Sequence, residues 1–406
     1  MDVGIDDIGF YGGPLTISYA EIARTRGLGE RGRQAAQFTR RSVVPPFEDP
    51  VTLAVNAARP IVDAAGADSF GLLLVATETG LDYARPLSTY VHRFLGLPAG
   101  CRHIELKNAC YAGAAALQLA AAWLRSGVAP GMKALVITTD VAGRRAHHPT
   151  EVTAGEGAVA ISVSADPRVL VLEPIEGCAS DYVTDLARPL PMQEAGDPHR
   201  SLHAYLDLLE MAWEQYRRRA GQVRFEERFR YMAYHTPLVW LVQVGHRALV
   251  QGDRPDATDE EIGRSFERMV RPSLRYAELV GNSYSGCVFV ALLGVLDGLT
   301  RDDAGARVGI FSYGSGASAE ILSATVASTA AATIAPRGVG AHLASRHDLC
   351  TADYDAAAAG VFDSLTSRTF VPDRAQPAWR FAEAYEGRRR LTLEKVQEFA
   401  RHYAWS

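Results

Sequence analysis

The stretch that decides the fold runs from residue 104 to residue 124 and reads IELKNACYAGAAALQLAAAWL. Its first residues, Ile104–Leu106, are predicted to form a short strand. The rest is rich in alanine and leucine, which are strong helix formers, and predicts a helix to about Leu124. Cys110 lies at the elbow between strand and helix. Because helix N-terminal N–H groups and the helix dipole favour a thiolate, Cys110 is a candidate nucleophile, and a buried, inert cysteine is the alternative.

The same order of strand and helix recurs on both sides of this elbow. Apolar runs predict further strands at residues 3–10, 70–75, 134–138, 157–164, 169–172, 231–234 and 307–311. Helical spacing of apolar residues predicts helices at residues 18–27, 50–65, 87–95, 201–219, 237–250, 286–296 and 391–403. Small residues of low complexity predict a loose connection at residues 324–337. The alternation indicates the α/β class with a largely parallel central sheet.

Composition limits the class of protein. The chain has 406 residues, of which 48% are hydrophobic and 22% charged, with a net charge of −5. This is ordinary globular composition, and the length predicts two domains or two fused halves. An acidic chain argues against nucleic acid as a partner, and its longest apolar stretch, Cys287–Leu296, is too short to span a membrane. Five cysteines without a Cys-x-x-Cys pair predict neither disulfides nor zinc, and together with an acidic N-terminus they favour the cytoplasm.

Polar side chains follow several of the predicted strands. Glu78 follows the strand at 70–75, and His235 follows the strand at 231–234. Ligands of open α/β sheets bind at the carboxyl ends of the strands, so we expect both residues to lie near Cys110. Burial would raise the pKa of Glu78 and make it a usable base, and His235 could act as an acid, a base or an oxyanion donor. A solvated carboxylate and a packed histidine are the alternatives.

Other candidates are weaker. The amide of Asn282, between two glycines at 281 and 286, could fix a substrate carbonyl, or could belong to an ordinary turn. Asp140 follows a predicted strand, where it is expected to cap or brace. His147 and His148 with Glu151 lack the spacing of a metal site, so an exposed polar patch is favoured. Residues 155–160 match a loose dinucleotide pattern but precede a strand where that motif requires a helix.

The segment around Cys110, ELKNACYAG at residues 105–113, closely resembles the nucleophile segment of 3-hydroxy-3-methylglutaryl-CoA synthases. Four further segments resemble this family in the same order: ATETGLD at 76–82, YHTP at 234–237, GN at 281–282 and FSYGSG at 311–316. The resemblance covers nearly the whole chain. It implies the thiolase-like fold, in which two related halves form five layers in the order α-β-α-β-α.

The resemblance also implies how the site is divided. Residues 1–167 would form an N-terminal half that carries Glu78 and Cys110, and residues 168–406 a C-terminal half that carries His235 and Asn282. Cys110, Glu78 and His235 would be catalytic. Asn282, Tyr284, Gly314 and Ser315 would bind substrate. No bound metal or cofactor is implied, and a homodimer is expected from the fold.

Further segments resemble the branch of the family found in polyketide gene clusters: DLARP at 185–189, EAGD at 194–197, SL at 201–202, YLD at 205–207 and HR at 246–247. Enzymes of that branch perform β-branching on chains tethered to acyl carrier proteins. Donor and acceptor carrier proteins are therefore the implied partners, and the phosphopantetheine arm would arrive with a carrier or as part of CoA. Basic side chains would meet an acidic carrier, and the candidates are Arg31, Arg33, Arg40, Arg41 and Arg247.

Three alternatives stay open beside this interpretation. The first is a primary-metabolic synthase that uses acetyl-CoA and acetoacetyl-CoA. The second is a ketoacyl synthase III, against which Glu78 argues because such an enzyme needs no base there. The third is an inert homologue that only binds carrier proteins. Two departures from the family bear on acyl-donor handling: Gln243 stands where relatives have a lysine associated with the pantetheine arm, and the loop between Asp140 and Gly155 is shorter.

Overall fold

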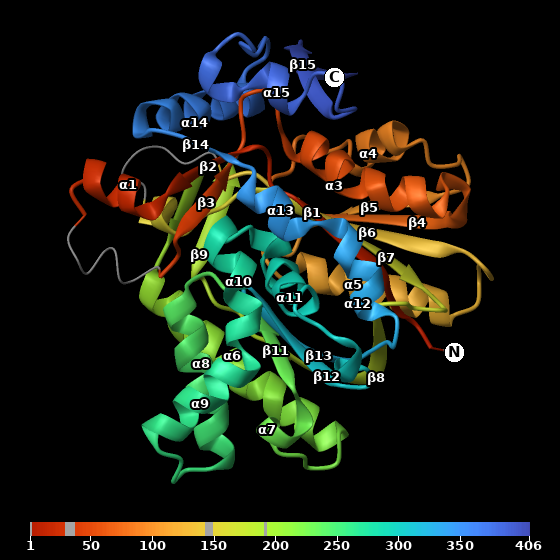
Figure 1. Ribbon diagram of the computed structural model, residues 1–406, viewed down its shortest axis with the longest axis vertical. Helices are drawn as coiled ribbons and strands as arrows, with labels where there is room; N and C mark the ends of the chain where they lie inside the picture. The colour runs from red at the N-terminus through yellow and green to blue at the C-terminus, as the bar shows by residue number, and fades with distance from the viewer. Residues whose placement is uncertain (1, 29–36, 143–148, 191–192) are drawn as a thin grey trace.

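The computed structural model describes residues 2–28, 37–142, 149–190 and 193–406, and the molecule is organised around one large sheet (Figure 1). Its nine strands lie in the order β11-β12-β13-β8-β1-β7-β6-β4-β5. Their bounds are β1 Gly4–Tyr11, β4 Phe70–Ala76, β5 Arg102–Leu106, β6 Lys133–Asp140, β7 Gly157–Ser164, β8 Leu170–Ser180, β11 Tyr231–Tyr234, β12 Arg307–Gly314 and β13 Ser318–Val326. Only two residue pairs join β1 to β8, so the sheet divides there into an N-terminal and a C-terminal part.

Strand directions in this sheet are mixed, and the prediction of a largely parallel sheet is wrong. β4 runs parallel to β5 and β6, and β11 runs parallel to β12. The other neighbouring strands pair antiparallel. The physical reason is visible between β12 and β13, where residues 315–317 are the whole connection. A parallel pair requires a much longer crossover, whereas a short turn returns the chain antiparallel.

Three helical layers enclose the two parts of the sheet. The central layer contains α5 (Ala112–Arg125) and α11 (Cys287–Leu296), which share one core with strands of both parts. The outer face of the N-terminal part is covered by α3 (Pro50–Ala65) and α4 (Ser88–Leu95), and that of the C-terminal part by α6 (Pro198–Arg219) and α8 (Val239–Asp253). Because α11 is covered on every side, all its residues are buried. The five-layered α-β-α-β-α arrangement is confirmed.

The smaller elements connect these layers or cover their edges. The remaining strands are β2 Leu15–Ser18, β3 Arg40–Val43, β9 Leu186–Leu190, β10 Gln193–Gly196, β14 His347–Asp348, β15 Leu391–Gln397 and β16 Ala400–Trp405. The remaining helices are α1 Tyr19–Thr25, α7 Phe225–Arg228, α9 Asp259–Met269, α10 Arg271–Val280, α12 Ala330–Ile334, α13 Val339–Ala344, α14 Thr351–Thr366 and α15 Phe381–Ala384. Among the residues described, no helix is long and apolar enough to cross a membrane.

Two predictions for the C-terminal half are wrong. Residues 391–403 form the hairpin of β15 and β16 instead of a helix. Leu391 and Leu393 are both buried, a spacing of two that fits a strand, and the turn residues Glu398 and Phe399 have φ of 52° and 61°, which turns the chain tightly. Residues 324–337 are not a loose connection, because β13 continues to Val326 and α12 follows it into the central core.

The last part of the chain returns to the N-terminal half. β14 pairs parallel with β2, and the Asn56 amide on α3 bonds the Leu391 backbone at both its N–H and its C=O, at 2.8 and 3.1 Å. The expected boundary after residue 167 falls in the connection between β7 and β8. The division into halves at that point stays a prediction.

Candidate active site

Cys110 occupies a tight elbow at the start of the central layer. Ala109 before it has a φ of 45°, a left-handed conformation that is unfavourable for alanine, and α5 begins at Ala112. The Cys110 side chain is only 8% exposed. Gly314, at the end of β12, allows this elbow to approach, because a Cβ there would lie 2.6 Å from the Tyr111 backbone nitrogen. The end of β12 therefore lies beside Cys110.

The Cys110 thiol faces Glu78, which follows β4. Its S–H donates to Glu78 Oε1 over 2.8 Å. Burial and the neighbouring Glu78 carboxylate raise the pKa of the Cys110 thiol well above its usual range. Burial and the charge of Asp140 raise the pKa of Glu78 to about 7. The expectation of a thiolate favoured by the helix terminus is wrong for this state, because desolvation and a nearby negative charge outweigh the helix dipole.

Asp140 holds the loop of Glu78 in place. One of its carboxylate oxygens accepts from the Glu78 backbone N–H at 2.8 Å and from the N–H and hydroxyl of Thr79 at 3.1 and 3.0 Å. The other accepts from the backbone and side chain of Ser285, which precedes α11. Asp140 is fully buried. It therefore ties the Glu78 loop to the central layer, a stronger contribution than the cap or brace expected from the sequence.

Arg188, on β9, is the single cation that the structure places against Glu78 among the described residues. Its Nη1 lies 3.8 Å from Glu78 Oε2, and its Nε lies 3.8 Å from Glu194 Oε1. Its guanidinium covers the Tyr284 ring at 5.2 Å. The side chain is 9% exposed, yet Nε and Nη1 have no hydrogen-bond partner. Its positive charge lowers the pKa of Glu78 and opposes the effect of burial.

Sequence reasoning did not single out Arg188 as a site residue. It appeared only as part of the DLARP segment, and a lone arginine carries little signal in a chain with 42 lysines and arginines. Its two unpartnered nitrogens leave N–H groups able to bind an oxygen of a substrate.

His235 lies at the end of β11, on the other side of the central layer from β4. Its ring is 2% exposed and stacks on Tyr313 at a centroid distance of 6.4 Å. Its backbone C=O accepts from the Tyr205 hydroxyl at 2.9 Å, which fixes the segment against α6. Burial lowers the pKa of His235 to about 3, so the imidazole is neutral at physiological pH. Its Nδ1 is buried without a hydrogen-bond partner.

Two side chains connect His235 with Cys110. Cys287 Sγ accepts from the Thr236 backbone N–H at 3.2 Å, and Cys287 lies close enough for its charge to affect the pKa of Cys110. Tyr313, which stacks on His235, has its pKa raised by burial, by Asp185 and, more weakly, by Cys110. Cys110 and His235 therefore share Cys287 and Tyr313 as neighbours, and Cys110 also contacts Glu78, which agrees with the strand-end argument.

The predicted substrate-binding residues differ in how they are placed. Tyr284 is buried in a small cluster with Cys110, its backbone has a φ of 52°, and its ring lies under the Arg188 guanidinium. The side-chain oxygen of Asn282 accepts from the Tyr284 backbone N–H at 3.0 Å, and the Asn282 backbone pairs with residues 153–155. Ser315 is half-buried beside Tyr313. Their roles toward a substrate stay predictions.

The basic residues proposed for carrier docking fall into three groups. Arg31 and Arg33 lie outside the described residues, as do His147 and His148. Arg41 is wrong as a docking residue, because it is 1% exposed and donates to the Glu151 backbone and to the Tyr354 hydroxyl. Arg40 and Arg247 are half-buried, and they pair with Asp348 and Asp259.

A cavity of about 350 Å³ opens beside Glu78. Residues 80–84 of the loop after β4 form one wall, and Arg188, Glu105 and Lys107 contribute charged groups. This volume is in the range of small-molecule sites, which is about 300–1,000 Å³. A bound group in this cavity would contact both Glu78 and Arg188.

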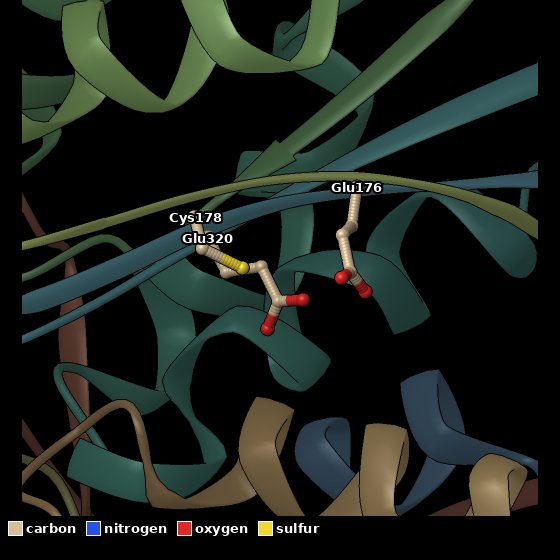
Figure 2. Close-up of side chains that lie close together, drawn as sticks. All are labelled: Glu176, Cys178 and Glu320. Atoms are coloured by element: carbon tan, nitrogen blue, oxygen red, sulfur yellow. The ribbon is translucent and has the colours of Figure 1, made fainter. Parts of the chain in front are cut away.

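Three other side chains that could bind a metal ion lie close together near Tyr111, the residue that follows Cys110. Figure 2 shows Glu176 and Cys178 of β8 with Glu320 of β13, and their donor atoms lie within 4.8 Å of one another. The Gln118 amide donates to both carboxylates, at 2.6 and 2.9 Å, and the Tyr111 hydroxyl donates to Glu320 at 2.9 Å. Since these oxygens already accept bonds from α5 and its first turn, the cluster anchors the residue that follows Cys110. The absence of a metal stays a prediction.

Comparison with known proteins agrees with this geometry. Residues 1–167 match the family described as hydroxymethylglutaryl-coenzyme A synthase N terminal, and residues 257–380 match its C-terminal counterpart. The whole chain is 34% identical to the polyketide biosynthesis 3-hydroxy-3-methylglutaryl-ACP synthase PksG of Bacillus subtilis, of which it covers 99%. The chain belongs to the hydroxymethylglutaryl-CoA synthase family. It is therefore an acyltransferase of the kind that condenses two acyl groups, and the predicted family and fold are confirmed.

Other relatives show the range of this family. The hydroxymethylglutaryl-CoA synthase of Enterococcus faecalis is 30% identical, over 91% of this chain and 94% of that protein. The HMG synthase of the curacin pathway, solved in complex with holo donor-ACP, superposes with a TM-score of 0.95 at 34% identity and full coverage of both chains. An HMG-CoA synthase solved with CoA gives a TM-score of 0.86 at 26% identity, again over both whole chains.

Proposed function

We propose that this protein is a β-branching synthase, which adds an acyl carbanion, in the simplest case from acetyl, to the β-ketone of a polyketide chain on a carrier protein. The observation that carries the proposal is the full-length similarity to two synthases whose names or structures include an acyl carrier protein. The hydrogen bond from Cys110 to Glu78 supports the chemistry, because it joins a nucleophile to a base.

Acyl transfer is the first proposed step. The Cys110 sulfur attacks the carbonyl of the donor thioester, and its proton passes to Glu78, whose pKa of about 7 suits a group that both takes and releases protons. The bond from the carbonyl to the donor sulfur breaks, and the donor leaves as a thiol with that proton. The phosphopantetheine arm belongs to the donor substrate, so this step needs no group bound permanently to the chain.

Condensation and release follow. Ionised Glu78 removes a proton from the α-carbon of the acyl group on Cys110, and the enolate attacks the β-ketone of the acceptor. The new tertiary alkoxide takes a proton from Glu78, and water then cleaves the thioester to give a free carboxylate and the Cys110 thiol. His235 is neutral because burial lowers its pKa to about 3, so its contribution is a hydrogen bond to a developing oxyanion. Asn282 and Tyr284 would position the acceptor beside it.

Partners and location belong to the same proposal. Donor and acceptor carrier proteins would present their acyl chains at the mouth beside Glu78, with Arg33 and Arg247 as docking residues. A homodimer is proposed through β5, which is the edge strand of the sheet and leaves Ile104 43% exposed. The free cysteines fit a reducing cytoplasm.

A primary-metabolic synthase acting on acetyl-CoA is the second candidate, because the Enterococcus faecalis relative carries that name at 30% identity. The two functions differ in the form of the acyl donor. The replacement of the family lysine by Gln243 bears on this difference, since that position is associated with the pantetheine arm.

The deciding experiment offers matched acetyl-CoA and acetyl-carrier protein to the wild-type enzyme and follows acetylation of Cys110 by intact mass. We expect faster acetylation from the carrier, and faster transfer from free CoA would overturn the proposal. Cys110→Ser should accumulate no acyl-enzyme. Cys101→Ser is the matched control, because Cys101 is also buried but lies in the core around α3, and it should acetylate as the wild type does.

A further inference from the structure

A second cavity, of about 480 Å³, lies where the C-terminal segment meets β2. Four arginines and two histidines line it: Arg346, Arg380, Arg388, Arg390, His342 and His347. His342 lies on α13 and His347 on β14, and the four arginines lie in the segments beside α13, β14 and α15, which Figure 1 shows in the blue C-terminal part of the chain. The one carboxylate in the lining is Glu383, which is already ion-paired with Arg380.

Arg346 is a buried cation without a counter-ion. It is 8% exposed, and its guanidinium donates to the backbone oxygens of Leu343 and Leu279 and to the hydroxyl of Ser42. These partners are uncharged. No carboxylate of the described residues lies within ion-pair distance, and the nearby Asp348 is held by Arg40. Burial and the charge of Arg40 lower the pKa of Arg346 to about 10, so the folded chain disfavours this charge.

Arg390 and Arg388 add positive charge to the same cavity. Arg390 lies over the rings of Tyr11 and Tyr385, at 5.1 and 5.8 Å, and donates to the Ala384 C=O at 2.8 Å. Arg388 is exposed, and no ion pair joins either residue to a carboxylate of the described chain. Glu48 is buried near Arg390, and burial raises the pKa of Glu48 to about 7, so near neutral pH this carboxyl is only partly ionised and offsets part of the positive charge.

Two of the arginines lie near the same histidine, His342. Burial, Arg390 and Arg346 together lower the pKa of His342 to about 3, so both guanidiniums act on the same imidazole. The His342 ring is therefore neutral, and its Nε2 accepts from the Gly12 backbone N–H at 3.3 Å. Three guanidiniums without carboxylate partners thus surround a cavity of small-molecule size.

We propose that this cavity binds a multiply charged phosphate ligand of nucleotide size. Guanidinium N–H groups donate to phosphate oxygens, and the positive charges of Arg346, Arg388 and Arg390 together match the charge of a diphosphate. The volume, about 480 Å³, exceeds what a lone phosphate requires and falls in the range of small-molecule sites. No lining residue is shared with the cavity beside Glu78, so the inference does not depend on the proposed reaction.

Calorimetric titration of the full chain with pyrophosphate and with adenosine diphosphate tests the proposal. We expect both to bind the wild type, and Arg388→Gln to weaken binding about tenfold, the loss of one bidentate contact. Arg389→Gln is the matched control, because Arg389 is the next residue, is exposed and does not line the cavity. It should bind as the wild type does.

Three results would overturn the proposal. The first is no heat of binding and no rise in the unfolding temperature with millimolar pyrophosphate. The second is equal loss of affinity in Arg388→Gln and Arg389→Gln, which would indicate general charge attraction. The third is tighter binding of citrate than of pyrophosphate, which would assign the cavity to carboxylates. Acetylation of Cys110 should be unchanged in Arg388→Gln, which separates this site from the catalytic one.

Discussion

The two cavities balance buried charge in opposite ways. Beside Glu78 the excess is negative, because Glu78, Asp140 and Glu194 meet a single arginine, Arg188. In the C-terminal cavity the excess is positive, and Arg346 is buried against uncharged oxygens. In the cavity beside Glu78, binding of a proton can neutralise the excess negative charge, since the pKa of Glu78 is raised to about 7. In the C-terminal cavity, arginine does not release its proton near neutral pH, so only a bound anion can neutralise the excess positive charge.

This difference separates a site for proton transfer from a site for binding. A carboxylate whose pKa is near the working pH exchanges protons readily, which general acid–base catalysis requires. A permanently charged guanidinium cannot do this, but it holds an oxyanion with directional hydrogen bonds. Substitutions of Glu78 and Arg188 alter the charges of the first cavity and leave the second cavity as an internal reference.

The largest expected effect comes from Glu78→Gln. The amide keeps the shape but cannot accept the α-proton, so we expect condensation to fall by about 10³-fold, within the usual range for loss of a general base. Acetylation of Cys110 should fall less than condensation. The Cys110 thiol is a stronger acid than the α-carbon of the acyl group, so its deprotonation depends less on Glu78. Product formation by liquid chromatography and mass spectrometry, with single-turnover acetylation in parallel, measures the two steps.

Glu105→Gln is the control for that substitution. Glu105 lines the same cavity, and burial raises its pKa too, but its carboxylate is bound to the Leu87 backbone N–H and not to Cys110. We expect condensation within a few-fold of wild type in this variant. A normal rate in Glu78→Gln would remove Glu78 as the base.

A smaller effect is expected from Arg188→Gln. Arg188 lowers the pKa of Glu78, so without this positive charge the pKa should rise above its present value of about 7. Because the base must be ionised, the acidic limb of the rate profile should move to higher pH, by about one unit for the loss of a neighbouring opposite charge. A profile of condensation rate from pH 5.5 to 9 measures this shift.

Lys107→Gln separates a specific contact from general electrostatics. Lys107 lines the cavity too, yet it is not among the largest influences on the pKa of Glu78. Its profile should match that of the wild type. An unchanged profile in Arg188→Gln, or a shift to lower pH, would contradict the assigned influence of Arg188 on Glu78.

Much of this site was accessible from the sequence because it depends on local pattern. An apolar run followed by Glu78, and a strand followed by His235, place both residues at strand ends whatever the neighbouring strands do. The elbow at Cys110 follows from a strand next to an alanine-rich helix. These predictions hold although the strand directions in the sheet are mixed. The reason is that β4 and β11, which precede Glu78 and His235, both pair parallel with their neighbours.

The parts that sequence reasoning missed depend on contacts between distant segments. The raised pKa of the Cys110 thiol comes from burial in the assembled core and from Glu78, which lies 32 residues earlier in the chain. Arg188 reaches the site from a two-stranded sheet with no catalytic pattern of its own. The C-terminal hairpin is not evident from the sequence, because Leu393 and Val396 are three residues apart, as in a helix, while Leu391 and Leu393 are two apart, as in a strand. The turn at Glu398 and Phe399 decides between the two.

The smallest expected effect concerns stability. Glu78 has an ordinary pKa of 4.5 when unfolded and about 7 when folded, so folding favours the protonated carboxyl. This group therefore destabilises the wild type progressively as pH rises from 4.5 to 7, by up to about 3 kcal/mol above that range. Glu78→Gln has no such charge, so its free energy of unfolding should exceed that of the wild type at pH 8 and approach it at pH 5. Urea unfolding at both pH values measures the difference, with Arg388→Gln, in the other cavity, expected to show no comparable dependence on pH. An equal difference at pH 5 and pH 8 would mean that the carboxylate charge is not what the fold opposes.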